Sequence, residues 1–349
     1  MKEIQYKTFS LRTHKKNWPI KRPNVCQFEL TFACDLHCKY CYSDCYNKPS
    51  LMKKELNTEQ VKFILDKVYD AGVIWLCFTG GDPLARDDFL DIYSYVRNKG
   101  FVITIFTTGY LMNKKVADYL EKRPPFVIEI TLNGVTKENY EEISGVKDSF
   151  ERVMDGLRMI IDRKIPLKIK TQLIKDNLKE SPKIKEFVEN LGLEFQPSFD
   201  LYPCLNQDST PCNLRVSPEE VLNLDKRLKI DSMENRTANI NLFRCAAGGG
   251  DGINLDPYGN MFLCNLIRQP FFNLLEVSIE NALNRLLPLA RDRKFITESK
   301  CKYCKIWDYC HNCPGRALLE TGDMEAPVPH YCELAQWTVR RMLHVNRAT

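Results

Sequence analysis

The sequence predicts an α/β protein built on a parallel β-sheet. Between residues 25 and 199, short runs rich in β-branched and aromatic residues alternate with amphipathic helical stretches. The six runs cover residues 25–32, 73–78, 101–106, 127–132, 167–174 and 194–199. Strands that alternate with helices pair in parallel through right-handed crossovers, so the runs are expected to form one sheet covered by helices.

Apolar spacing and end signals mark helices between these runs. The helix after the first run has Thr58 as its cap candidate, ends before Gly72 and carries on one face Val61, Ile64, Leu65 and Val68. A similar stripe covers residues 150–161, and Ser181-Pro182 opens a further helix.

Length and composition fit a globular chain of about two domains. Of the 349 residues, 44% are apolar and 27% are charged, and no run approaches the roughly 20 apolar residues that span a bilayer. Residues 1–22 are basic and lack the apolar core of an export signal. The 15 cysteines therefore indicate a reducing cytoplasm in which thiols bind metal, and the net charge of +5 gives no case for nucleic-acid binding. We expect a cytoplasmic location, with neither a membrane nor a nucleic acid as partner.

Three closely spaced cysteines follow the first run. Cys34, Cys38 and Cys41 are separated by three and two residues, in the loop expected after the first strand. Three thiolates turned toward one point suit a four-iron cluster, in which the iron without a protein ligand is free to bind a small molecule. A zinc knuckle is the alternative, because Cys-x2-Cys pairs also bind zinc in intracellular proteins.

Glycine-rich and polar loops follow the later runs. These loops are Gly80-Gly81-Asp82-Pro83, Thr107-Thr108-Gly109 and Asn133-Gly134. In parallel α/β folds the functional groups gather at the carboxyl ends of the strands. Two consecutive glycines also let the backbone approach a ligand closely, so these loops are candidates for one binding site.

The cysteine spacing, with the aromatic Tyr40 before the last cysteine, resembles the signature of the radical S-adenosylmethionine (radical SAM) superfamily. The resemblance implies a partial (β/α)6 TIM-type barrel and a SAM-binding 4Fe-4S cluster on the three cysteines. It also implies that the loop Gly80-Gly81-Asp82-Pro83 holds the amino group of SAM, mainly through its backbone, because Asp82 is shorter than the usual glutamate. The remaining candidate SAM contacts, for the ribose, adenine and carboxylate, are Thr107, Thr131, Asn133 and Lys170.

Seven of the fifteen cysteines fall between residues 245 and 332. Two Cys-x2-Cys pairs are typical of a zinc ribbon or a ferredoxin-like loop, but seven thiolates are too many for one four-ligand site. The layout resembles the SPASM extension of many radical SAM enzymes, with one residue fewer between Cys310 and Cys313. The resemblance implies two auxiliary 4Fe-4S clusters, the first on Cys245, Cys264 and Cys313, the second on Cys301, Cys304, Cys310 and Cys332. The first has either an open iron or Asp251 as a further ligand.

Four parts are expected along the chain. A solvated basic arm (1–24) precedes the barrel (25–200), and a bridge (201–244) contains a helix that opens at Ser217-Pro218 and carries Val221, Leu224 and Leu228. The cysteine-rich domain (245–349) ends in a short helix with Leu334, Trp337 and Met342. The remaining thiols are interpreted as ordinary cysteines: Cys26, Cys45, Cys77, Cys204 and Cys212.

The resemblance implies an enzyme that uses a 5′-deoxyadenosyl radical to modify a ribosomally made peptide by a thioether or carbon-carbon crosslink. Flavodoxin or ferredoxin is the expected reductant. The arm is too short for a leader-binding domain, so a leader would need a separate binding protein or the bridge.

Four alternatives stay open: peptide epimerisation, oxidation of a small molecule such as a haem-pathway intermediate, a non-catalytic iron-sulfur carrier, and a zinc-binding interaction module. Sulfatase maturation is disfavoured, because Asn265 stands where those relatives carry an aspartate base and an amide is no general base near neutral pH.

Overall fold

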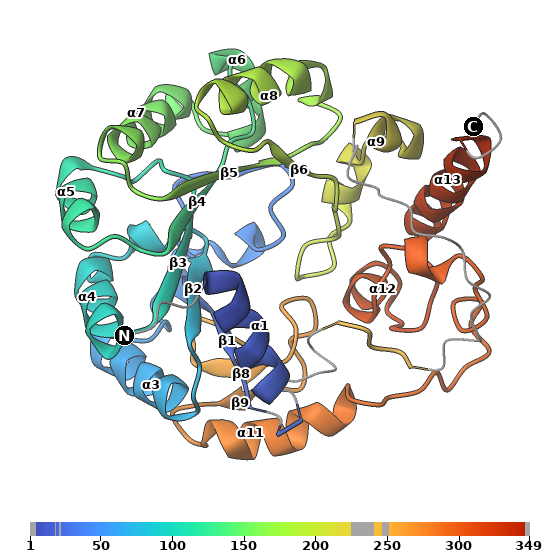
Figure 1. Cartoon of the computed structure of the whole chain (residues 1–349), viewed down its shortest axis with the longest axis horizontal. Helices are drawn as coiled ribbons and strands as arrows, with labels where there is room; N and C mark the ends of the chain where they lie inside the picture. Colours follow the sequence, from blue (N-terminus) through green and yellow to red (C-terminus); the bar gives the residue numbers. More distant parts are fainter. Residues whose placement is uncertain (1–4, 18, 21, 225–240, 246–250, 346–349) are drawn as a thin grey trace.

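A computed structural model of the chain describes residues 5–17, 19–20, 22–224, 241–245 and 251–345. Their strands form one sheet in the order β6-β5-β4-β3-β2-β1-β7-β8-β9. The first six strands run parallel in chain order: β1 (Val25–Thr31), β2 (Trp75–Gly80), β3 (Val102–Thr107), β4 (Val127–Thr131), β5 (Leu167–Gln172) and β6 (Gln196–Ser198). The sheet is open, with β6 and β9 at its edges (Figure 1), which confirms the predicted partial barrel.

Helices cover the outer face of this sheet (Figure 1). They are α3 (Thr58–Asp70), α4 (Phe89–Lys99), α5 (Lys114–Lys122), α6 (Lys137–Ser144), α7 (Ser149–Asp162) and α8 (Ser181–Asn190), and the short α2 (Pro49–Met52) follows the cysteine loop. Alternate strand residues point into this helical layer and are completely buried, among them Phe28, Phe78, Ile105 and Ile130. The residues between them therefore face the concave interior of the barrel.

Helix α3 begins one residue earlier than predicted. Asn57 is the N-cap: its side chain accepts from the amide of Gln60, and the side chain of Gln60 accepts from the amide of Asn57. Thr58 instead donates its hydroxyl to Asp88 over 2.6 Å. Gly72 follows the helix with φ of +88°, as its predicted place after the C-cap requires.

Residues 6–17 of the predicted basic arm form a helix that was not predicted from the sequence, while Lys7, Arg12, Lys15 and Lys16 are exposed, as expected for a solvated arm. The helix is α1 (Tyr6–Asn17), whose aromatic side chains pack on the amino ends of the strands. The rings of Tyr6 and Phe126 lie 4.7 Å apart, and the ring of His14 stacks on Trp75 at 4.9 Å. These aromatic residues hold the helix to the sheet, and the sequence gives no helical stripe strong enough to predict this.

The cysteine-rich region extends the same sheet. β7 (Gly252–Leu255) pairs in parallel with β1, and β8 (Asn260–Phe262) and β9 (Phe272–Asn273) add in antiparallel order. The later helices are α11 (Ile279–Leu286), α12 (Pro314–Thr321) and α13 (Pro329–Val345). α13 is thus longer than the predicted closing helix. No helix of the described ranges is long and apolar enough to cross a membrane.

The predicted bridge helix is present as α9 (Pro218–Leu224). It packs on α13 through Val221 and Leu334. Leu228, which was assigned to the same helix, lies outside the described residues.

Paired arginines tie the C-terminal region to the barrel. Arg268 donates to both carboxylate oxygens of Glu29 over 2.7 Å each, and the Glu29 side chain is completely buried on the inner face of β1. Arg316 donates in the same two-pronged way to Asp200, which lies just after β6. Such two-pronged pairs fix orientation as well as distance.

Removing one of these guanidinium groups tests how firmly the two regions are joined. In Arg268→Ala, the buried carboxylate of Glu29 loses its charge partner, so the free energy of unfolding should fall by about 3–5 kcal/mol. Denaturant unfolding of the purified variant measures the loss. The matched control is Arg158→Ala, because Arg158 and its partner Asp155 are mostly exposed and their pairing is worth at most about 1 kcal/mol. Equal losses in the two variants would contradict the prediction.

Candidate active site

The loop after β1 brings the first three cysteines together. The thiol of Cys34 lies within electrostatic reach of Cys38 and Cys41, and the amide of Cys41 donates to the carbonyl of Cys38 over 2.8 Å. Burial, together with the nearby Cys41, raises the pKa of Cys38 to about 12. The protein alone thus keeps these thiols protonated, and a bound metal centre would supply the positive charge that favours thiolates.

The spacing of these sulfur atoms does not suit a single zinc ion. Sulfur ligands of a tetrahedral zinc lie about 3.8 Å apart, because Zn–S bonds are about 2.3 Å long. In the part of the chain that the structure describes, the only three or more potential ligand atoms within 4.8 Å of one another belong to Glu141, Asp148 and Glu151, which share Lys137 as ion-pair partner. Cys34, Cys38 and Cys41 do not form such a close group, which is compatible with a larger iron-sulfur cluster.

Gly80 and Gly81 allow the loop after β2 to contact the end of β1 and the start of the cysteine loop. The amide of Gly81 donates to the carbonyl of Thr31, and the amide of Asp82 donates to that of Ala33, each over 2.8 Å. A Cβ on Gly80, whose φ is +131°, would lie 2.1 Å from the Thr31 oxygen, and one on Gly81 would lie 2.3 Å from the Ala33 oxygen. Both positions require glycine because no side chain fits this contact.

The carboxylate of Asp82 is buried and fully engaged within the protein. It accepts from the hydroxyls of Thr107 and Thr108, from the amide of Thr108 and from the amide of Leu84, at 2.8 to 3.0 Å. Burial raises the pKa of Asp82, and the hydrogen bonds oppose that shift. Asp82 and Thr107, both candidates for ligand contact, therefore bind each other, and Pro83 begins the buried turn η2 (Pro83–Ala85) beside them.

A cavity of about 340 Å³ opens at the carboxyl ends of β3 to β6. Of the candidate SAM contacts, Tyr40, Thr131 and Lys170 line it. Lys170 forms an ion pair with Glu129 on the neighbouring strand, and its ammonium lies 4.1 Å from the centre of the Phe106 ring. The face of β5 that carries Lys170 thus lines the barrel interior.

Several buried polar atoms at this end of the barrel lack a hydrogen-bond partner within the described residues. They include the side-chain oxygens of Asn133, Tyr140 and Thr171. An unsatisfied buried polar atom costs about 1–3 kcal/mol, which a bound ligand with polar groups would offset. Asn133 and its surroundings therefore fit a ligand such as SAM.

Sequence reasoning missed several cavity residues, namely Tyr42, Glu129, Asp200 and Tyr202. Glu129 had a signal, because it alternates with the core residues Ile128 and Ile130 and so shares the inner face of its strand. Asp200 and Tyr202, which follow β6, had no such sequence signal, because residues 200–204 follow no periodic pattern.

The seven C-terminal cysteines fall into two groups. Cys264 lies within electrostatic reach of Cys313 and Cys245, and burial raises its pKa to about 11. Cys310 lies within reach of Cys332, Cys301 and Cys304, and burial raises its pKa to about 11 as well. The structure thus brings together the same three and the same four cysteines that the SPASM resemblance grouped.

Asp251 does not join the first group. Its carboxylate binds His14 over 2.8 Å and accepts from the amide nitrogen of the Asn24 side chain, at the amino end of β7. The suggestion that Asp251 completes the Cys245 group is therefore wrong, because the carboxylate is used to anchor α1. Asn265, next to Cys264, keeps a buried side-chain oxygen without a partner among the described residues.

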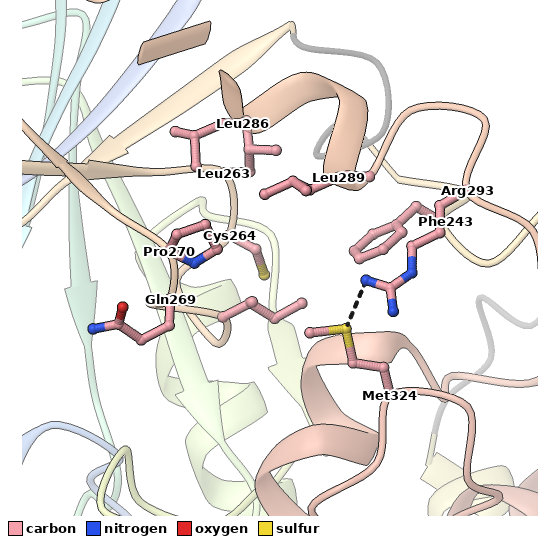
Figure 2. A pocket seen from close by; sticks show the side chains of 11 residues that line it. Phe243, Leu263, Cys264, Gln269, Pro270, Leu286, Leu289, Arg293 and Met324 are labelled. Carbon is pink, nitrogen blue, oxygen red and sulfur yellow. Dashed lines mark hydrogen bonds between the residues drawn. The ribbon is translucent and has the colours of Figure 1, made fainter. Parts of the chain in front are cut away.

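An apolar cavity of about 180 Å³ adjoins Cys264 (Figure 2). Its lining includes Phe243, Leu263 and Leu286, and on one side the guanidinium of Arg293 donates to the sulfur of Met324 over 3.7 Å. The apolar wall limits access of water to the Cys264 thiol, a factor that would tune the redox potential of any metal centre bound at this thiol.

Comparison with known proteins adds sequence and structural relatives. The AdoMet-dependent heme synthase of Methanosarcina barkeri is 26% identical over 348 residues, covering 89% of this chain and 96% of that protein. The antilisterial bacteriocin subtilosin biosynthesis protein AlbA of Bacillus subtilis is 23% identical, covering 82% of this chain and 66% of AlbA. The crystal structure of Streptococcus suis SuiB bound to S-adenosylmethionine has a TM-score of 0.68 at 15% identity, covering 95% of this chain and 81% of SuiB. That structural likeness supports the fold alone.

Residues 28–188 match the family description "Radical SAM superfamily". They run from β1 to the end of α8 and include the cysteine loop and the Gly80-Gly81 loop. On this match and on the fold that surrounds it, residues 28–188 form a radical SAM domain, and the chain is a SAM-dependent enzyme.

Proposed function

We propose that this radical SAM enzyme modifies a peptide and that two auxiliary iron-sulfur clusters assist it. The observation that carries the choice of a peptide is the charge pattern of the cavity. Lys170 is paired with Glu129, and the arginines that reach the cavity region, Arg268 and Arg316, are paired with Glu29 and Asp200. A porphyrin with its propionates needs unpaired cations, whereas a peptide segment needs the mixed polar and aromatic lining that is present.

The three cysteines after β1 would hold the SAM-binding cluster. Within reach of SAM the chain offers the Gly80-Gly81 backbone, the unpartnered oxygen of Asn133 and, from the cavity wall, Thr131 and Lys170. When bound, a reduced cluster of this kind supplies the electron that splits SAM into methionine and a hydrogen-abstracting 5′-deoxyadenosyl radical.

The residues of the cavity orient the reactants and limit water. Lys170 pairs with Glu129 and its ammonium lies over the Phe106 ring, so it fixes the polar wall of the cavity. Tyr40 packs on Ile143, Ile174 and Leu201 and so closes the side of the cavity next to the cysteine loop. Exclusion of water around this site strengthens every electrostatic contact within it and protects a reactive radical.

The two C-terminal cysteine groups would hold the auxiliary clusters. Such clusters would supply one-electron transfer there, with a flavodoxin or ferredoxin as the external reductant. The expected product is a thioether or carbon-carbon crosslink in the peptide.

A second candidate is oxidation of a haem-pathway porphyrin. It is favoured by the heme synthase relative, which aligns with this chain over 96% of its own length. The assay that separates the two uses anaerobically reconstituted, dithionite-reduced enzyme with SAM and either synthetic peptides of any short open reading frames that flank the gene or iron-coproporphyrin III. Loss of two hydrogens from the peptide supports the proposal. Conversion of the porphyrin, with the peptide left unchanged, would contradict the proposed peptide substrate.

Replacing Cys34, Cys38 and Cys41 together by alanine should abolish 5′-deoxyadenosine formation, because the SAM-binding cluster would lose all its protein ligands. Chromatography of the quenched reaction measures the product. The matched control replaces Cys26, a fully buried thiol of β1, by alanine and should leave the product detectable. Continued formation of 5′-deoxyadenosine by the triple variant would contradict the assignment.

Loading with iron tests the auxiliary sites. The wild-type chain should bind about twelve iron atoms, as three four-iron clusters require. Replacing Cys301, Cys304 and Cys310 by alanine should lower this by about four, because one cluster loses most of its ligands. Iron and sulfide assays on reconstituted protein give the count. A variant that keeps the wild-type iron content would contradict a cluster at this site.

Gly80→Ala tests the contact between the second loop and β1. The added methyl group collides with the Thr31 carbonyl, so the affinity for SAM should fall at least about tenfold, in line with the cost of a strained, displaced loop. Equilibrium binding of SAM to reconstituted enzyme measures it. Gly100→Ala is the matched control: its φ of +91° is also strained, but nothing lies within 4 Å of the added atom. Similar SAM affinities in the two variants would refute the role of the contact.

A further inference from the structure

The segment of residues 200–204 joins the cysteine loop to the C-terminal region. On the side of the cysteine loop, the thiol of Cys204 donates to the carbonyl of Cys41 over 3.3 Å. The next residue, Leu205, donates its amide to the carbonyl of Tyr42 over 2.9 Å. These two hydrogen bonds fix the segment to the end of the cysteine loop, at Cys41 and Tyr42.

The same segment is held from the other side by residues next to the C-terminal cysteines. Asp200 binds Arg316, three residues after Cys313, and pairs with His311 at 3.3 Å. Burial alone would raise the pKa of Asp200, but the hydrogen bond from His311 and the charge of Arg316 lower it to about 2. The hydroxyl of Tyr331 donates to the carbonyl of Leu201 over 2.8 Å. Residues 200–204 therefore contact neighbours of all three cysteine groups.

Tyr202 is the middle residue of this segment, and its side chain lines the cavity. Its ring lies 5.7 Å from that of Tyr42. Its phenol is within electrostatic reach of both Cys264, from the first C-terminal group, and Cys41, from the SAM-binding group. The side chain therefore stands between two of the proposed cluster sites.

The hydroxyl of Tyr202 makes no hydrogen bond with any residue that the structure describes, unlike its neighbour. Tyr42 is directed to Glu29, with 3.4 Å between the hydroxyl and a carboxylate oxygen. A phenol keeps its proton near neutral pH, so Tyr202 offers a donor to the cavity. A ring with one unused donor is suited to hold a peptide, because it supplies both apolar area and a directional contact.

We propose that Tyr202 contacts the substrate: its hydroxyl donates a hydrogen bond to the peptide and its ring packs beside the carbon that loses hydrogen. This inference rests on the proposed peptide substrate. It places the reacting carbon between the SAM-binding site and the first auxiliary site, where an electron has the shortest way to leave after hydrogen abstraction.

The test compares Tyr202→Phe and Tyr202→Leu with the wild-type enzyme. The first readout is the affinity for a fluorescently labelled peptide that the wild-type enzyme modifies in the assay above, measured with SAM and without reductant, so that no turnover occurs. Loss of one neutral hydrogen bond should weaken binding by Tyr202→Phe about fivefold. Tyr202→Leu also loses aromatic contact and should weaken binding more than about tenfold. The control, Tyr95→Phe on the outer helix α4, removes a hydroxyl that binds Asp66 and should bind as the wild type does.

The second readout is the amount of modified peptide per 5′-deoxyadenosine formed. It should fall in both Tyr202 variants, because a poorly placed peptide lets SAM cleavage proceed without product. Iron content and SAM cleavage without peptide should stay at wild-type levels. Wild-type affinity and coupling in Tyr202→Phe would overturn the proposal, as would a parallel loss of iron and SAM cleavage, which indicates a purely structural role.

Failure of the peptide assignment gives a different result. The wild-type enzyme would then convert iron-coproporphyrin III and leave the peptide unchanged. The same variants would be compared on the porphyrin, and unchanged porphyrin affinity would overturn the role of Tyr202 as a substrate contact as well.

Discussion

The buried carboxylate of Asp82 is the constraint on which the active-site end of the barrel depends. It accepts from Thr107 and Thr108 after β3, while its own amide donates to Ala33 at the root of the cysteine loop. One residue thus sets the relative positions of the loops after β1, β2 and β3. Each donor lost to a buried carboxylate costs about 1–3 kcal/mol or more, so these loops hold together as one unit. The position of any ligand on the cysteine loop follows from this unit.

Local patterns predicted the barrel well because its signals are local. Apolar strand runs, the face of α3 and Gly72 each report a short-range requirement of the chain, and the structure has them in place. The grouping of the C-terminal cysteines came from resemblance and not from spacing. Neither the local patterns nor the family resemblance predicted that Asp251 binds His14, because that contact joins residues 237 positions apart. The position of Tyr202 could not be predicted either, because it is set by contacts with the cysteine loop and with the C-terminal region, both distant in sequence.

Three two-pronged arginine pairs neutralise acidic groups where the C-terminal region meets the barrel and the bridge. Glu29, Asp200 and Glu320 each receive an arginine through two hydrogen bonds. Buried pairs of this kind add little net stability compared with apolar contacts, but breaking one is costly, so they act mainly as fixed reference points. In an enzyme whose proposed reaction passes an electron between separate sites, such reference points keep the separations constant while a substrate enters and leaves.

The pairing of β7 with β1 places the last strand needed by the barrel far along the chain. Until residue 252 is available, β1 has a bare edge, and its Val25–Thr31 backbone can accept a strand from another molecule. A nascent chain that has completed only β1 to β6 is therefore exposed to misassembly during synthesis. Production of the enzyme should accordingly depend on chaperone supply and on rapid completion of the C-terminal third, quite apart from the delivery of iron.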